Sequence, residues 1–273
     1  MKIVPEFRYV FPIMDQLNAV AKYIRYLSKA RTRHGIHSPF VYRFIEEVIR
    51  NRSHFYIFDE IRVRRNELKY DNRMIRIADF GAGSGQMGNH ERKVRDILTH
   101  SAMPERWGKL LYRLVRFVQP DSVLELGTSL GMGSAYLFSA CPDAKMISLE
   151  GCPQTASVAQ ETFEKLKLNA KIGIGEFSET LPDALAEISG LGLAFIDGNH
   201  RYEPTMKYFE ACMPHVQEHS VLVFHDIHWS PGMEAAWNEL REDSRVTVSL
   251  DLFHMGILFF RKEQTKEHFV LRY

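Results

Sequence analysis

The stretch from Leu124 to Leu137 reads LELGTSLGMGSAYL, and it decides the fold that we expect from this sequence. An apolar run at residues 123–126 predicts a β-strand. The glycines from Gly127 to Gly133 predict the turn that follows this strand. A strand that enters a glycine-rich turn is typical of sheets that bind a nucleotide-type cofactor at the strand ends.

The residues after this turn complete one β-α-β unit. A helix is expected from Ala135, and an apolar run at residues 145–149 predicts the next strand, which ends in Glu150. Glu150 stands 23 positions after Gly127, close to the spacing at which an acidic residue binds ribose hydroxyls. The glycines are spaced G-x-x-x-G-x-G, without the opening G-x-G of a dinucleotide site, so we expect a cofactor that has no phosphates.

A second glycine-rich stretch, GAGSGQMG at residues 81–88, contains a literal G-x-G-x-x-G from Gly83 to Gly88. The residues after it are polar and lead into two expected helices, without a second strand that ends in an acidic residue. A glycine pattern without that context is weak evidence for a cofactor site. We expect this stretch to form a connection or a lid, and a dehydrogenase that binds its cofactor there is the alternative.

Short apolar runs alternate with helical patterns from residue 122 onward, as in β-α units around a mostly parallel sheet. The expected strands are SVLEL, KMISLE, AKIGI, LAFID, VLVFHD, VTVSLDL and GILFFRK. The last two are close in sequence, so they should form an antiparallel hairpin. We therefore predict an α/β fold with a Rossmann-like, mostly parallel seven-stranded sheet that ends in this hairpin. Residues 1–104 should form a mainly helical cap and substrate region, and residues 105–273 the cofactor-binding domain.

Composition indicates a globular protein, with 45% hydrophobic residues, 25% charged residues and a net charge of +1. The charge is uneven, because residues 1–76 contain 16 Lys and Arg against 8 Asp and Glu, and the rest contain 19 against 26. Both a solvated helical surface and an anionic partner are compatible with such a basic segment. The three cysteines form no C-x-x-C pair, and no stretch has the roughly 18 apolar residues of a membrane span, so we expect a cytoplasmic protein without a membrane partner.

Titratable side chains gather where two expected strands end. The sequence Asp197-Gly-Asn-His200 follows one strand, and His225-Asp-Ile-His228 follows the next. The carboxyl ends of parallel strands lie at one edge of a sheet, so these groups should be close together. His200 is the expected proton acceptor, because an imidazole titrates near neutral pH. Tyr202 and Trp229 are either an aromatic wall for a substrate or core residues.

Over residues 105–261 the sequence resembles the class I S-adenosylmethionine-dependent methyltransferases. The matching motifs are Glu125-Leu-Gly-Thr-Ser-Leu-Gly131, Glu150 at the end of the second strand, and Phe195-Ile-Asp-Gly-Asn-His200 at the fourth. The resemblance implies S-adenosyl-L-methionine as the cofactor. It implies these cofactor-binding residues: Gly127, Ser129 and Gly131 at the methionine portion, Glu150 at the ribose, Glu176 or Phe177 beside adenine, and also Glu125 and Asp197.

Within that class the sequence looks like the metal-dependent, catechol-type O-methyltransferases. Asp197 and Asp226 match the two aspartates of that subfamily, and His200 stands where it has a catalytic lysine; we expect all three to be catalytic. Ile227 replaces the asparagine, and its lack of an oxygen ligand argues against magnesium. A metal held by Asp197 and Asp226 with His225 or His228 would favour a transition metal. Without a metal, Asp197 orients the substrate and His200 is the base.

These features favour O-methylation of a small hydroxylated molecule. No Asp/Asn-Pro-Pro-aromatic motif, which the resemblance would require for most amine methylation, follows the fourth strand. One alternative is an RNA methyltransferase whose basic N-terminal segment contacts phosphates; its candidates are Arg31, Arg33, Arg43, Arg50, Arg52, Arg62, Arg64 and Arg65. Another is a cofactor-binding module without turnover. A monomer and a homodimer both agree with the sequence.

Overall fold

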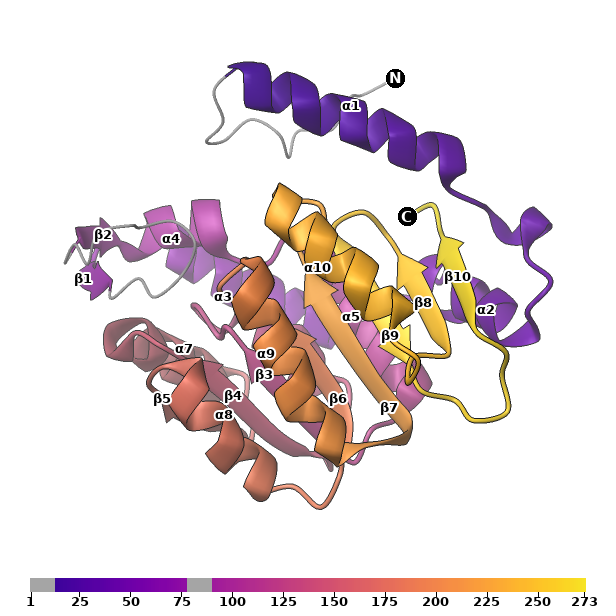
Figure 1. The fold of residues 1–273 in the computed structure, drawn as a ribbon. Helices are drawn as coiled ribbons and strands as arrows, with labels where there is room; N and C mark the ends of the chain where they lie inside the picture. Colours follow the sequence, from indigo (N-terminus) through magenta and orange to yellow (C-terminus); the bar gives the residue numbers. More distant parts are fainter. Residues whose placement is uncertain (1–12, 78–89) are drawn as a thin grey trace.

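An eight-stranded sheet forms the centre of the computed structural model, which describes residues 13–77 and 90–273 (Figure 1). The strand order is β10-β8-β9-β7-β6-β3-β4-β5. In chain order the strands are β3 (Ser122–Leu126), β4 (Lys145–Glu150), β5 (Lys171–Ile174), β6 (Leu191–Ile196), β7 (Val216–His225), β8 (Val248–Asp251), β9 (Met255–Phe259) and β10 (Glu267–Val270). Within this sheet only β9 runs antiparallel to its neighbours, so seven strand ends point to one edge.

All seven predicted strands are present, and the predicted hairpin is the antiparallel pair of β8 and β9. The prediction omitted β10, whose sequence Glu-His-Phe-Val shows only a short alternation. It forms because it pairs in parallel with β8, and the backbone N–H of Glu267 donates to the carbonyl oxygen of Thr247 at 2.8 Å. A strand this short depends on its neighbour more than on its own propensity.

Two layers of helices cover the sheet. The elements on one face are α2 (Pro39–Phe44), the π-helical turn η3 (Ile45–Ile49), α3 (Ile57–Lys69), α5 (Glu105–Val118), α6 (Met132–Ser139) and α7 (Pro153–Lys165). The other face packs against α8 (Phe177–Ala186), α9 (Tyr202–Cys212) and α10 (Pro231–Glu242), which lie in front of the sheet in Figure 1. The turn η4 (Met213–His215) leads from α9 into β7.

The N-terminal helices share the core of the sheet. One buried cluster joins these helices to the sheet. It contains Phe44 of α2, Val48 of η3 and Phe58 of α3, together with Leu110 of α5 and Val123 of β3. The predicted helical character of this region is therefore confirmed. The division of the chain at residue 104 stays a prediction, since these helices pack directly on the sheet.

Helix α1 (Ile13–Lys29) lies above the arrowheads of the strands (Figure 1). It is attached through Tyr23 and Tyr26, whose rings lie 5.0 and 5.2 Å from the ring of Phe253, and through Lys22, which is 3.0 Å from Glu234. The chain then continues through the 3₁₀ turn η2 (Arg33–Gly35). None of the helices in the described ranges combines the length and the apolar character that crossing a membrane requires.

The second glycine stretch, residues 81–88, falls in the gap between the described ranges. The strands on either side, β1 (Met74–Ile77) and β2 (His90–Lys93), form a sheet of their own and pair antiparallel, with Ile77 opposite His90. A dinucleotide-binding turn instead joins parallel strands of one sheet. Neither β1 nor β2 was among the seven predicted strands. The strand β2 leads directly into α4 (Val94–Ser101), which packs against α3.

We expect Gly127→Ala to destabilise the fold by about 3 kcal/mol or more. The φ angle of Gly127 is +104°, and a Cβ atom there would overlap with the carbonyl oxygen of Asp197. Chemical denaturation measures the effect. Gly35→Ala is the control, because the nearest atom to a Cβ at Gly35 is 3.9 Å away. Equal stability of the two variants would contradict the close approach of these loops.

Candidate active site

The turn after β3 is held by backbone hydrogen bonds to the neighbouring strand. The N–H groups of Gly127 and Thr128 donate to the carbonyl oxygen of Leu149 at 2.9 and 3.3 Å, and Gly131 donates to Thr128 at 2.9 Å. Gly127, Ser129 and Gly131 have positive φ angles of 104°, 50° and 78°. The turn therefore bends sharply into α6 and presents a helix N-terminus beside the ends of β3 and β4, which is a common place for a ligand.

Glu150 lies across this turn. Its carboxylate accepts hydrogen bonds from the backbone N–H of Ser129 at 2.8 Å and from that of Cys152 at 2.9 Å. Burial raises the pKa of Glu150, and these N–H groups act in the opposite direction. The side chain is therefore on the turn side of β4, where a ribose that accepts or donates hydrogen bonds could reach it.

Glu125 lies beneath the same turn and has no exposed surface. Its Oε2 accepts hydrogen bonds from the hydroxyls of Ser134 and of Ser148, the latter at 2.6 Å, and the hydroxyls of Ser148 and Thr128 lie 2.5 Å apart. Burial raises the pKa of Glu125 to about 8. Its Oε1 accepts no hydrogen bond from the described residues. The group supports the turn from inside, and its predicted contact with the cofactor stays a prediction.

Glu176 and Phe177 follow β5 at the start of α8. Glu176 is exposed and its backbone precedes the helix, while Phe177 is half-buried. The ring of Phe177 lies 5.8 Å from that of Tyr208 and packs against Gly198. Both residues lie at the strand end where the resemblance implies that adenine binds. One face of Phe177 belongs to the core. Their role in binding stays a prediction.

A cluster of polar side chains joins the ends of β6 and β7. Oδ1 of Asp197 lies 2.8 Å from Nδ1 of His225 and 3.6 Å from Nε2 of His200. Ligand atoms from these three residues all lie within 4.8 Å of one another. Their side chains are 14 to 23% exposed, so they are partly buried and still accessible to a substrate. The structure thus brings together the residues that the sequence placed at one sheet edge.

Asp226, the residue after β7, lies next to this cluster. It adopts a φ angle of 54°, its Oδ2 is 3.5 Å from Nδ1 of His225, and its Oδ1 is 3.7 Å from Nδ1 of His254. Burial raises the pKa of Asp226, but His225, His254 and His200 outweigh this and hold it below its ordinary value. Asp226 is therefore an anion that holds imidazoles in place.

Sequence reasoning missed His254. It lies at the tip of the β8–β9 hairpin, and its ring packs 5.3 Å from that of Trp107 in α5. The sequence did contain a signal for it. Because β8 runs parallel to β7, the predicted hairpin turns at the sheet edge where β7 ends and where Asp226 lies. What the sequence could not give is the direction in which the ring points.

His228 and Ile227 point away from the cluster. The ring nitrogens of His228 lie 2.9 Å from Asp251 and 3.3 Å from Glu234. Ile227 has no exposed surface and packs in the core beneath α9 and α10. Of the two histidines that the sequence offered as metal ligands, the structure brings His225 to Asp197 and directs His228 elsewhere.

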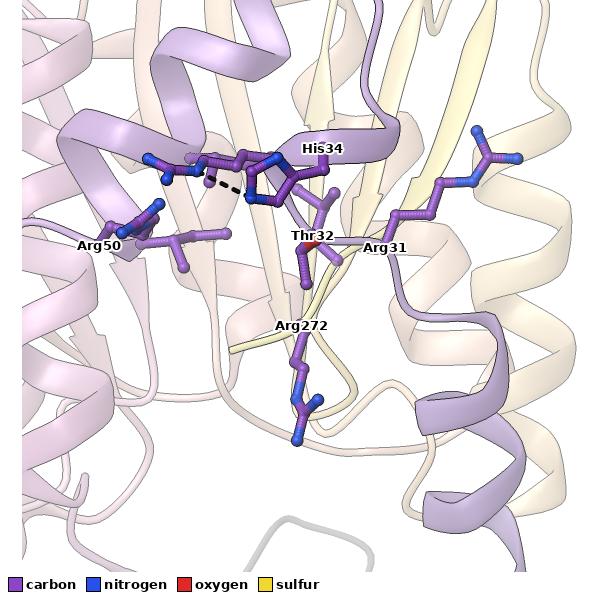
Figure 2. A pocket seen from close by; sticks show the side chains of 9 residues that line it. Arg31, Thr32, His34, Arg50 and Arg272 are labelled. Atoms are coloured by element: carbon purple, nitrogen blue, oxygen red, sulfur yellow. Dashed lines mark hydrogen bonds between the residues drawn. The ribbon is translucent and has the colours of Figure 1, made fainter.

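A separate pocket of about 370 Å³ lies between the segment at residues 31–34, η3 and the end of β10 (Figure 2). It is lined by Arg31, Thr32, Arg33, His34, Ile45, Ile49, Arg50, Leu271 and Arg272. The side chains of Arg31 and Arg272 point apart in Figure 2, and Arg33 and Arg50 share the carboxylate of Glu46 at 3.4 and 3.2 Å. The arginines therefore do not converge on a single anion.

Comparisons with known proteins agree with this geometry. Residues 124–227 match the family described as methyltransferase domain. A catechol O-methyltransferase from Niastella koreensis is 32% identical over 107 residues, which are 38% of this chain and 48% of that protein. The chain spans about half the length of the curated relatives it matches.

Solved structures share the fold over a longer range. The methyltransferase PaMTH1 from Podospora anserina, bound to SAH, has a TM-score of 0.57 and 14% identity over 83% of this chain and 97% of that one. The O-methyltransferase TomG from Streptomyces achromogenes, in complex with SAM, has a TM-score of 0.55 and 16% identity over 77% of this chain and 91% of that one. The comparisons therefore agree with the predicted fold, and residues 124–227 match a methyltransferase domain.

We expect Glu125→Gln to remove a pH dependence of stability. Because the folded pKa is about 8 and the ordinary value is 4.5, the contribution of the Glu125 proton is complete below the lower value and is lost as the pH rises through the higher one. The difference in unfolding free energy between wild type and variant should shift in favour of the variant by up to roughly 1.4 kcal/mol per pH unit in that range. Denaturant titrations at several pH values measure it. The exposed Glu179→Gln is the control, and identical curves for wild type and Glu125→Gln would contradict the burial of this carboxyl.

Proposed function

We propose that this protein is an S-adenosylmethionine-dependent methyltransferase that methylates an oxygen atom of a small hydroxylated molecule. The observation that carries the proposal is the position of two groups at one sheet edge: the turn with Glu150 beside β3 and β4, and the cluster around Asp197 beside β6 and β7. The first group suits a cofactor with a ribose, and the second suits a hydroxyl that must lose a proton.

The residues of the turn have distinct roles in this proposal. Glu150 holds the ribose hydroxyls, and the bent backbone at Gly127, Ser129 and Gly131 lets the methionine portion approach closely. The backbone N–H of Asp197 donates to the carbonyl oxygen of Leu126 at 2.8 Å, which fixes the acceptor cluster against the same turn. The bound cofactor supplies an electrophilic methyl group. The protein contributes mainly the alignment of the two reactants.

The acceptor hydroxyl lies beside Asp197 and His200 in this proposal. Nε2 of His200 is 3.6 Å from Asp197, beyond ordinary hydrogen-bond distance, whereas His225 is close enough to bond the same oxygen. In the metal-free protein, Nε2 of His200 is thus the atom that we propose to accept the proton. Trp229 is 48% exposed and donates its backbone N–H to the backbone carbonyl oxygen of Asp226, and we propose its ring as an aromatic surface for the acceptor. Catechol-like diphenols are therefore the first acceptors to assay, as the names of the relatives also suggest.

We expect Glu150→Gln to weaken cofactor binding by about 10- to 100-fold, since a charged acceptor of hydrogen bonds is lost. Calorimetry with S-adenosylmethionine and with its demethylated product measures the dissociation constants. Glu179→Gln is the control for a change of charge on the surface. Thermal unfolding of both variants separates loss of binding from loss of the fold, and an unchanged affinity would remove Glu150 from the site.

We expect His200→Ala to lower kcat for a diphenol by about 10²- to 10⁴-fold and to leave cofactor affinity unchanged. His219→Ala is the control, because His219 is exposed on β7 far from the strand end that carries His225. Mass spectrometry measures the methylated product and the demethylated cofactor that form together. Cofactor binding without any methyl transfer by the wild type would instead favour a module without turnover.

An RNA acceptor is the second candidate, and the arginine-lined pocket of Figure 2 is the observation that favours it. Arg31 and Arg272, whose guanidinium groups point apart, could each neutralise a separate phosphate of a strand. The same assay with RNA as acceptor tests this candidate. RNA methylation together with binding that falls steeply with salt would favour it, and binding that is weak and independent of salt would reject it.

A further inference from the structure

We propose that Asp197, His200 and His225 bind a divalent transition-metal ion of the zinc type at the acceptor end of the sheet. This inference rests on the proposed function only for the role of the ion in catalysis. The binding site itself is inferred from the positions of these three side chains and of the residues around them.

The geometry fits such an ion closely. Zinc–nitrogen and zinc–oxygen bonds of about 2.0–2.2 Å place two ligand atoms roughly 3 to 3.5 Å apart. Oδ1 of Asp197 already lies 2.8 Å from His225 and 3.6 Å from His200. The ligand atoms of the two histidines lie within 4.8 Å of each other, so ion binding needs at most a shift of their side chains toward a common centre. Asp197 directly follows β6, and His225 is the last residue of β7. Paired strands therefore hold two of the three ligands.

The same geometry does not fit magnesium, which the resemblance to catechol-type enzymes implies. Magnesium requires oxygen ligands, and this donor set offers one carboxylate and two imidazoles. The position expected to give a further oxygen is Ile227, which packs in the core. Imidazoles with one carboxylate favour zinc, iron and related ions instead.

Asp226 has a supporting role in this site. Its carboxylate is not one of the three groups whose ligand atoms lie within 4.8 Å of one another. It lies 3.5 Å from Nδ1 of His225, the nitrogen that also faces Asp197, and 3.7 Å from Nδ1 of His254, so its negative charge lies just outside the three ligands. This assignment differs from the resemblance, in which Asp197 and Asp226 would both be metal ligands.

Three protein ligands leave open positions on the ion for a substrate oxygen. An ion held by these residues would lower the pKa of a hydroxyl bound to it, and the released proton would pass to solvent. In this loaded form Nε2 of His200 is a ligand and no longer accepts the proton. The bound ion and the free imidazole of His200 are thus two alternative ways in which this cluster could promote loss of the proton from the acceptor hydroxyl.

Metal binding can be measured without cofactor or acceptor, so its failure and the failure of the proposed function are distinguishable. Protein treated with a chelator is titrated with Zn²⁺ by calorimetry and with Co²⁺ by visible absorption. We expect one ion per chain, no competition from millimolar Mg²⁺, and binding at least about tenfold weaker in Asp197→Asn, His200→Ala and His225→Ala. Asp226→Asn should have a smaller effect than Asp197→Asn.

His219→Ala is the matched control, since it removes an imidazole from the opposite end of β7 and should bind like the wild type. Thermal unfolding shows which variants remain folded, and the partly exposed His200 gives the informative variant if His225→Ala does not fold. The proposal is overturned if the wild type binds neither ion, if Mg²⁺ competes at comparable concentration, or if folded His200→Ala binds Zn²⁺ as tightly as the wild type. An equal loss in Asp226→Asn and Asp197→Asn would overturn the assignment of ligands.

Discussion

The parallel pairing of β3 with β4 on one side and β6 on the other is the constraint on which the rest of the structure depends. Leu126 at the end of β3 lies opposite both Leu149 and Ile196. This register brings the turn at Gly127, the carboxylate of Glu150 and the backbone of Asp197 within reach of one another. A glycine is needed at residue 127 because the loops after β3 and β6 touch there, and not only because a ligand approaches.

Two acidic groups, Glu125 on β3 and Asp226 directly after β7, have different electrostatic surroundings. Glu125 is enclosed by hydroxyls and apolar side chains, and burial raises its pKa. Asp226 is surrounded by imidazoles, which hold its pKa below the ordinary value in spite of burial. The inner part of the site thus favours a neutral carboxyl that braces the turn, and the outer part favours an anion that can hold histidines. This difference separates the cofactor side of the proposed site from the acceptor side.

The N-terminal region is in contact with the acceptor side of the proposed site. Phe253 at the β8–β9 hairpin contacts Tyr23 and Tyr26 of α1, and its neighbour His254 contacts Asp226. The helix that lies above the strand ends is therefore connected to the polar cluster through one hairpin. A role of this region in substrate selection stays a prediction.

The sequence by itself determined the α/β fold, seven of the eight strands of the central sheet, the turn at Gly127 and the edge at which Asp197, His200, His225 and Asp226 meet. Apolar periodicity and glycine spacing encode these features locally, and the C-terminal ends of parallel strands must share an edge. Only the tertiary structure decided that β10 joins the sheet, that Glu125 is enclosed, and that His225 rather than His228 faces Asp197. Those outcomes depend on side-chain direction and on partners far away in the chain, such as Asp251 and Glu234 for His228, which no local pattern specifies.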